Sequence, residues 1–144
     1  MLPELPAVTL RDGSYHPVDS SELAFRTAAR AAFREAFLAS RPLVLEPVMK
    51  VEVETPSEFQ GNVQGDISAR RGLLVGCDGR GTFSVVRAEV PLAEMFGYAT
   101  AVRSNTQGKA TFSMEFVRYR PVPASVQVQL ATAYREKVAA GNAS

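Results

Sequence analysis

His16 and Cys77 are the only histidine and the only cysteine in the chain, so catalysis or metal binding would be expected to involve them first. A catalytic histidine needs a nucleophile or a carboxylate held beside it, and only Asp19 lies near His16 in the sequence. A zinc site needs more Cys and His ligands than this chain has. The segment DGRG at 78–81 lacks the GK[ST] of a phosphate-binding loop and does not open a helix. From these residues alone we expect a loop histidine, a cysteine in or near the core, and neither an active site nor a nucleotide site.

Arginines provide the second kind of chemistry, because the guanidinium fork matches the oxygens of a phosphate. They occur as a stripe with a four-residue repeat and as an adjacent pair: Arg26, Arg30, Arg34, and then Arg70 with Arg71. The formal net charge is only +1, so any contact with nucleic acid must use a local patch. A solvated helix face would also explain the stripe, and the helix macrodipole would favour a cationic pair at a helix C-terminus.

The stripe lies on a segment with strong helical character. Residues 22–40 are rich in alanine, contain no Gly or Pro, and follow two serines that can cap a helix. The loop before them, RDGSYHPVDSS, is dense in turn formers, and residues 7–10 (AVTL) are prone to form a strand. We therefore predict a strand, a loop and a helix over residues 1–41, followed by a stiff connector at 42–47 that is bracketed by prolines.

Residues 48–120 alternate between strand and helix patterns. We predict strands from residue 48, over 73–77, over 83–90 and from 111, with helices over 58–70 and 92–104. The order β-α-β-β-α-β predicts an α+β fold of the ferredoxin-like class: a four-stranded antiparallel sheet with both helices on one face. A terminal helix over 124–139 and a frayed tail complete the last segment, residues 121–144.

The two faces of the predicted sheet differ in polarity. One face is apolar. The positions that alternate with the apolar ones put charged side chains on the other face: Lys50, Glu52, Glu54, Arg87, Glu89 and Glu115. RNA-recognition motifs of the same topology stack bases on aromatic side chains of this face. Because no aromatic residue stands there, any RNA contact should use helices and loops.

Four segments, in order, resemble the C-terminal part of bacterial elongation factor G: DGSYHPVDSSELAF, LEPVMKVEVETP, GDISARRG and VPLAEMFGYATAVRSNTQGKATFSMEF. The resemblance covers residues 7–120. It implies that residues 1–41 are the strand-loop-helix remnant of domain IV, a ribosomal protein S5-like domain, and that residues 48–120 are domain V. Pro17 departs from the acidic residue that is more frequent in the family, which is compatible with a divergent paralogue.

The resemblance also implies a function. The family is a translational GTPase that moves transfer RNA and messenger RNA through the ribosome, with domain IV reaching the decoding region. The tip-loop residues expected to contact transfer or ribosomal RNA are Gly13, Ser14, Tyr15 and His16. The basic surfaces that could contact RNA are those of Arg26, Arg30, Arg34, Arg70 and Arg71. The expected partners are therefore the ribosome and the other domains of the parent factor.

The chain itself is not expected to be an enzyme. It shows no GTPase domain, so GTP and magnesium would belong to a missing domain of the parent, and we expect no cofactor or metal here. The sequence contains no run of transmembrane length and no signal-peptide pattern, so we expect a cytoplasmic protein without a membrane partner.

Three alternatives remain at this point. The parent could be a related factor that recycles or protects ribosomes. The chain could instead be a stand-alone ferredoxin-like interaction module. The third alternative is an acylphosphatase-like enzyme, which the segment TPSEFQGN disfavours because it supplies no arginine between the first strand and the first helix.

Overall fold

The computed structural model describes residues 6–141, which divide between Val44 and Leu45 into two compact units. This division falls inside the segment predicted as a connector, residues 42–47. The positions of the two units relative to one another are not determined, so each is described by itself.

Within residues 6–44, the described part of the N-terminal unit, there is one helix, α1 (Glu22–Ala39). Ser21 caps it, because its hydroxyl accepts a hydrogen bond from the Ala24 N–H at 3.1 Å. The predicted strand at residues 7–10 is wrong: this segment is extended but pairs with no strand in the described part of the chain. β-propensity measures how well a segment fits beside neighbouring strands, and without such a neighbour it does not produce a strand.

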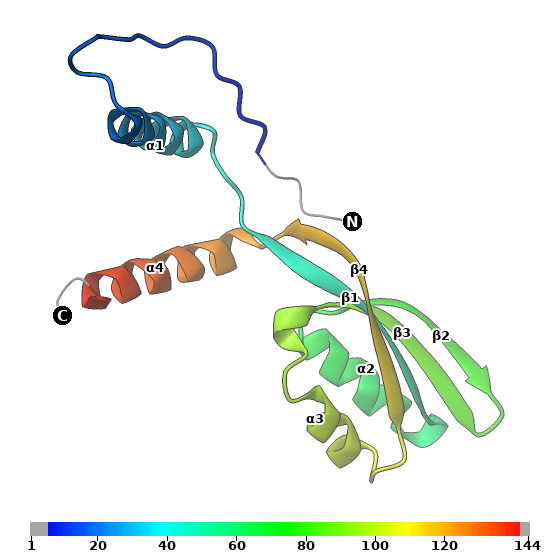
Figure 1. Cartoon of the computed structure of the whole chain (residues 1–144). Helices are drawn as coiled ribbons and strands as arrows, with labels where there is room; N and C mark the ends of the chain where they lie inside the picture. The colour runs from blue at the N-terminus through cyan, green and yellow to red at the C-terminus, as the bar shows by residue number, and fades with distance from the viewer. Residues whose placement is uncertain (1–5, 142–144) are drawn as a thin grey trace. The chain divides into compact units, whose positions relative to one another are not determined.

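The C-terminal unit confirms the ferredoxin-like prediction. Its elements, in chain order, are β1 (Leu45–Pro56), the 3-10 turn η1 (Ser57–Phe59), α2 (Gln60–Ala69), β2 (Leu73–Arg80), β3 (Phe83–Pro91), the 3-10 turn η2 (Leu92–Glu94), α3 (Tyr98–Asn105), β4 (Thr111–Pro121) and α4 (Ala124–Gly141). The four strands pair antiparallel in the order β2-β3-β1-β4, and α2 and α3 lie together on one side of the sheet (Figure 1).

The core lies between this sheet and its two helices. Val51 and Val53 of β1 are fully buried and pack in one cluster with Ile67 of α2 and Tyr98 of α3. The opposite face is charged, as predicted. Lys50 lies between Glu89 and Glu115 in the strand register, and its ammonium is 3.7 Å from the Glu115 carboxylate.

Three boundaries differ from the prediction. β1 starts at Leu45, so half of the predicted connector belongs to the sheet. The second helix starts at Tyr98 and not at residue 92, because Gly97 has a φ of 76° and separates η2 from α3. The hairpin between β2 and β3 turns at Gly81 and Thr82, after DGRG has continued the strand through Arg80.

Edge positions account for two further differences. Cys77, which we expected in or near the core, is exposed, because every residue of the edge strand β2 is exposed. Met114 and Phe116 point to the helix side as predicted, yet about 40% of each stays exposed on the other edge strand, β4. The helices cover the two central strands and leave much of both edge strands open.

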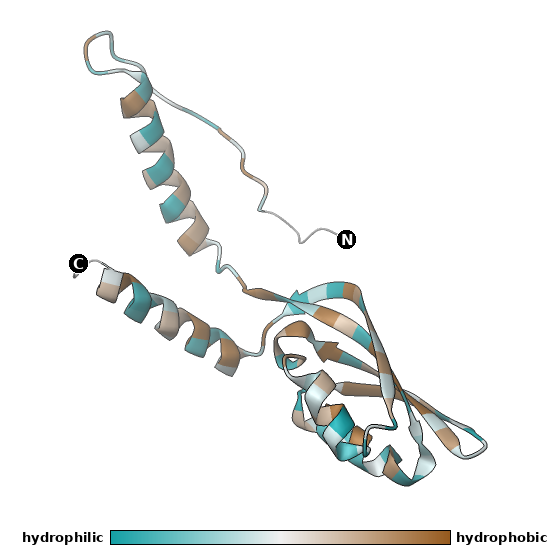
Figure 2. Ribbon diagram, turned by 60° about the horizontal axis from the view of Figure 1, so that its bottom comes forward, coloured by the Kyte–Doolittle hydropathy of each residue, from teal (hydrophilic) through white to brown (hydrophobic). Residues whose placement is uncertain are grey.

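The terminal helix α4 agrees with the helix predicted over 124–139. Figure 2 shows apolar bands along both α1 and α4, and neither helix has a buried residue. No helix within residues 6–141 is long and apolar enough to cross a membrane. The predicted frayed tail includes residues 142–144, which lie outside the described residues.

We predict that the N-terminal unit opens more readily than the β-module. Phe25, Phe33 and Phe37 of α1 are between 37% and 49% exposed, so little apolar burial opposes the loss of chain entropy on folding. Amide hydrogen exchange should be at least tenfold faster in α1 than in β1 and β3. Equal protection of α1 and β3 would contradict this prediction.

Tyr98 provides a second prediction. Its hydroxyl is buried and has no hydrogen-bond partner among the described residues, and its ring packs edge-on against Phe112 with centroids 4.9 Å apart. Burial raises the pKa of Tyr98 to about 12. The folded state therefore holds this proton more tightly than the unfolded state, and the resulting stability is present below the unfolded pKa of about 10 and is lost as the pH rises through about 12.

Replacing Tyr98 with Phe should change the free energy of unfolding at pH 7 by less than about 1 kcal/mol, because the lost hydroxyl has no partner. Between pH 10 and pH 12 the variant should lose less stability than the parent chain, by on the order of 2 kcal/mol. Urea titrations of both chains at pH 7, 10 and 12 measure this difference. Parallel pH profiles would refute the assignment.

Candidate nucleic-acid interface

The loop before α1 is closed at its base by two hydrogen bonds. The Ser20 N–H donates to the His16 carbonyl at 3.0 Å, and the Ser20 hydroxyl accepts from the His16 N–H at 2.8 Å. Pro17 directly follows the accepting carbonyl, where its fixed φ suits a turn and its missing N–H is not needed. The loop therefore keeps a defined backbone from residue 16 to residue 20.

Tyr15 is held against α1, whereas His16 is presented to solvent. The Tyr15 ring stacks on Phe25 with centroids 6.4 Å apart and an interplanar angle of 12°, yet 66% of Tyr15 remains exposed. His16 is exposed, and no partner contacts its imidazole within residues 6–141. The structure thus brings the predicted tip-loop residues Gly13, Ser14, Tyr15 and His16 together on one exposed loop. An aromatic face and a hydrogen-bonding imidazole side by side can contact bases and phosphates.

The arginine stripe lies on the exposed surface of α1. Arg26 pairs with Glu22 at 2.6 Å, an exposed pair with little energetic value. Arg30 and Arg34 have no acidic partner in the described part of the chain, so their guanidinium groups remain available to an external anion.

Arg70 is engaged inside the β-module. Its Nη1 donates to the Glu94 carbonyl at 2.6 Å and to the Phe96 carbonyl at 3.3 Å, and its Nε donates to Asp66 at 3.2 Å. The guanidinium also lies 5.1 Å from the centre of the Tyr98 ring. These contacts attach the C-terminus of α2 to the loop before α3 and leave Arg70 little capacity for a phosphate.

Arg71 is engaged in the same way. Its two terminal nitrogens donate to the two carboxylate oxygens of Glu46, at 3.1 and 2.9 Å, and its Nε donates to Glu94 at 3.1 Å. Hydrogen bonds from Arg71 hold the pKa of Glu46 below its ordinary value, although burial of the carboxyl acts in the opposite direction. A guanidinium has five N–H donors, and Arg71 uses three of them in these hydrogen bonds. Few donors are therefore left for RNA.

The backbone of Arg71 is unusual as well. It has a φ of 59°, the left-handed conformation that glycine usually supplies after a helix. The Arg71 N–H donates to the Ser68 carbonyl and the Gly72 N–H to the Ile67 carbonyl, which completes a Schellman motif. Gly72 is required by close approach, because a Cβ there would lie 2.6 Å from Ile67 Cγ2. The left-handed position is therefore held by Arg71, and the glycine stands one residue after it.

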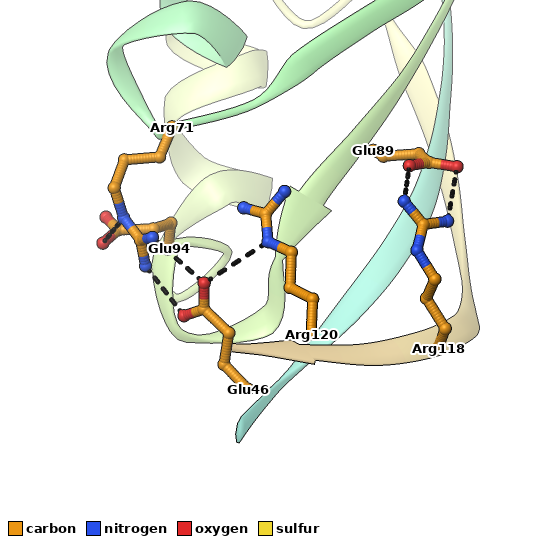
Figure 3. A network of polar contacts seen from close by, with 6 residues as sticks. All are labelled: Glu46, Arg71, Glu89, Glu94, Arg118 and Arg120. Carbon is orange, nitrogen blue, oxygen red and sulfur yellow. Dashed lines mark hydrogen bonds and ion pairs between the residues drawn. The ribbon is translucent and has the colours of Figure 1, made fainter. Parts of the chain in front are cut away.

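Sequence reasoning missed Glu46, which lies in the segment predicted as a connector. It is buried, and Arg120 of β4 lies 3.6 Å from its carboxylate (Figure 3). The signal was available: a lone acid in the apolar run PLVLEPV needs a cationic partner if the run folds into a sheet. No cluster of three potential metal ligands occurs within residues 6–141.

The β2-β3-β1-β4 sheet under two helices defines the C-terminal unit as a ferredoxin-like α+β domain, with an exposed loop and helix preceding it on the chain. The comparisons with known proteins then identify the family. Residues 43–130 match the family model for the elongation factor G C-terminus, and residues 7–41 match that for elongation factor G, domain IV. The chain belongs to the elongation factor G family of translation factors.

Individual relatives agree with the family models. The chain is 52% identical over 128 residues to elongation factor G 1 of Desulfotalea psychrophila and 53% identical over 135 residues to that of Syntrophus aciditrophicus. These alignments cover 89% and 92% of this chain but only 18% and 19% of the relatives, so the chain spans about a fifth of their length. A solved crystal structure from Thermus thermophilus matches with a TM-score of 0.72 and 40% identity, over 87% of this chain and 19% of that one.

We predict that Arg71 and Arg30 contribute very differently to stability. Replacing Arg71 with Ala should lower the free energy of unfolding by about 2–3 kcal/mol, because it leaves the buried Glu46 with only its weaker partner Arg120. The matched substitution Arg30→Ala should stay within about 0.5 kcal/mol. Urea denaturation of the two variants measures both values. A similar loss of unfolding free energy in the two variants would show that the contacts of Arg71 within the β-module do not stabilise it.

Proposed function

We propose that this chain is the RNA-docking end of an elongation factor G-like translational GTPase, and that it contacts transfer RNA and ribosomal RNA while the ribosome translocates in the cytoplasm. The observation that carries this proposal is the tip loop: a backbone closed between His16 and Ser20 that presents Tyr15 and His16 to solvent. The family match adds the context in which such a loop would meet RNA.

The proposed role of the loop is mechanical and electrostatic. The two hydrogen bonds between His16 and Ser20 define the turn at the end of the loop, so this part of the backbone is ordered before docking. Tyr15 supplies an aromatic face, His16 a hydrogen-bonding imidazole, and Arg30 with Arg34 two cations on the helix that follows. Such groups suit a single-stranded or irregular RNA surface better than a regular duplex groove.

GTP chemistry would take place elsewhere in the longer protein. The chain offers no glycine-rich phosphate loop ahead of a helix, so the nucleotide and its magnesium ion would be held by a part of the protein not included in this sequence. Arg70 and Arg71 remain proposed RNA contacts only in a minor way, because most of their donors are used within the β-module.

Replacing His16 with Ala in a longer elongation factor G that carries this sequence should slow translocation by about tenfold, because it removes one interaction with RNA that stabilises the transition state by about 1.4 kcal/mol. Ribosome-stimulated GTP hydrolysis should stay within twofold, because the loop takes no part in nucleotide chemistry. Rapid-kinetic assays of messenger RNA movement and of phosphate release measure the two rates.

Val18→Ala is the matched control, since Val18 is 92% exposed in the same loop and should leave both rates unchanged. An equal loss of both activities in the His16 variant, or no loss of either, would contradict a role for the tip loop in contacting RNA.

A further inference from the structure

Asp12 and Gly13 lie in the loop before α1, on a stretch without backbone hydrogen bonds. Both residues are exposed and belong to no helix, strand or turn. Within residues 6–141, neither takes part in a hydrogen bond between two backbone groups. The hydrogen bonds that define the turn of this loop join His16 to Ser20, further along the chain. The backbone around Asp12 and Gly13 is therefore free to change its dihedral angles.

The Asp12 side chain is folded back onto the peptide bond that follows it. The Gly13 N–H donates a hydrogen bond to Asp12 Oδ1 at 2.7 Å. No cation pairs with the Asp12 carboxyl group in the described part of the chain. Gly13 has no side chain, and a Cβ at its position would meet no atom within 4 Å. The carboxyl group and the nitrogen of the next residue thus lie close together in open space.

This arrangement is the starting point of an intramolecular cyclisation. The Gly13 nitrogen attacks Cγ of the protonated Asp12 carboxyl group, an N–Cγ bond forms, and the hydroxyl of the acid leaves as water with the proton of the nitrogen. A succinimide ring results. Water then opens the ring. Cleavage between nitrogen and Cγ restores aspartate, whereas cleavage between nitrogen and the Asp12 carbonyl carbon gives isoaspartate. One water is released and one is consumed, so no other reactant is needed.

The chain contains the same dipeptide a second time, in a setting that opposes this reaction. Asp78 and Gly79 lie within β2, where both are paired with β3 in the sheet. The Asp78 carboxylate is also bound by Arg87. Cyclisation there would require the strand to leave its extended conformation and the ion pair to break. The two dipeptides therefore differ in their structural setting and not in their residues.

A second aspartate lies in the same loop as Asp12. Asp19 precedes Ser20, and an Asp–Ser pair can cyclise by the same steps. Its nitrogen is engaged, however, because the Ser20 N–H donates to the His16 carbonyl at 3.0 Å. Asp12 is thus the aspartate of this loop whose following nitrogen has no acceptor except the carboxyl group that it would attack.

We propose that Asp12–Gly13 is a modification site, where the loop spontaneously forms a succinimide and then isoaspartate, and that the product is a substrate for a carboxyl methyltransferase that recognises isoaspartyl residues. Isoaspartate moves a methylene group from the side chain into the main chain and leaves a free α-carboxylate. The methyltransferase would join an oxygen of this carboxylate to the methyl group of a sulfonium donor, which leaves as a neutral thioether.

The lengthened main chain would lie shortly before Tyr15 and His16. Because Tyr15 stays stacked on Phe25 of α1, the extra methylene would have to be absorbed between Asp12 and Tyr15. The modification would therefore change how the tip loop is presented to RNA. This consequence rests on the proposed function, whereas the modification itself does not.

The first test follows the 144-residue chain while it is kept near neutral pH for several weeks. Digestion after glutamate gives peptides 5–22 and 59–89, and mass spectrometry of their fragments assigns isoaspartate to individual positions. Isoaspartate should form at residue 12 at least about tenfold faster than at residue 78 or residue 19, because only the backbone at residue 12 is free. Equal rates in the folded chain, or no isoaspartate at residue 12, would overturn the proposal.

The same measurement in urea separates the effect of the fold from that of the sequence. Once the chain is unfolded, residues 12 and 78 should react at rates that agree to about threefold, since each aspartate precedes a glycine. If residue 12 remained tenfold faster in urea, the difference would not come from the loop and the strand, and the structural argument would be wrong.

Gly13→Ala is the matched variant, because the loop has room for a Cβ at this position. The added methyl group hinders attack by the nitrogen, so isoaspartate at residue 12 should fall at least about tenfold while residue 78 is unaffected. A purified isoaspartyl methyltransferase with a radiolabelled methyl donor should label the aged parent chain and not the aged variant. A failure to label a chain that contains isoaspartate at residue 12 would overturn the proposed substrate role.

The second test ages a longer elongation factor G that carries this sequence. Translocation should fall in proportion to isoaspartate at residue 12 and recover after treatment with the methyltransferase, while GTP hydrolysis stays within about twofold of its fresh value. Retained translocation in the aged factor, combined with slow translocation in His16→Ala, would overturn the effect of the modification on the tip loop. If neither change affects translocation but isoaspartate still forms at residue 12, the proposed function fails and the modification site stands.

Discussion

A carboxylate buried at the start of β1 constrains the whole C-terminal unit, because its charge has to be met from outside the strand. Arg71 meets it with two parallel hydrogen bonds, and this requirement places the end of α2, the left-handed turn after it and the last residues of β4 around one point. Such a pair is a weak argument for high overall stability, since apolar residues of similar size could replace it. It is a stronger argument for a specific arrangement, because removing either partner leaves the other unpaired.

The two units of the chain differ in how much they bury and in whether their arginines are paired within the chain. The β-module buries its valines completely between the sheet and two helices, and there its arginines are occupied by internal acceptors. The N-terminal unit buries no residue of α1 and leaves Arg30 and Arg34 without an acidic partner among residues 6–141. The unpaired cations thus lie on the unit for which we predict the lower local stability.

The sequence allowed the fold of the β-module to be predicted because β1 and β4 alternate between apolar and polar residues over most of their length and the turns contain glycine or proline. Local patterns could not show that residues 7–10 would lack a neighbouring strand, or that Gly97 would separate η2 from α3. The tip-loop residues Gly13, Ser14, Tyr15 and His16 were selected by resemblance, and their contact with RNA stays a prediction. The internal roles of Arg70 and Arg71 depend on acceptors 23 to 26 residues away in sequence, which no local rule can locate.

The exposed edge strand β2 carries the single thiol of this chain, at Cys77. A disulfide within this chain is impossible, so a disulfide between two copies would join them at Cys77, along unprotected strand edges that are able to pair. The same placement offers one accessible point for attaching a maleimide dye or a spin label on a rigid element, remote in sequence from the tip loop. The exposed position of Cys77 therefore calls for a reducing agent when the protein is handled, and it allows the chain to be labelled at a single site.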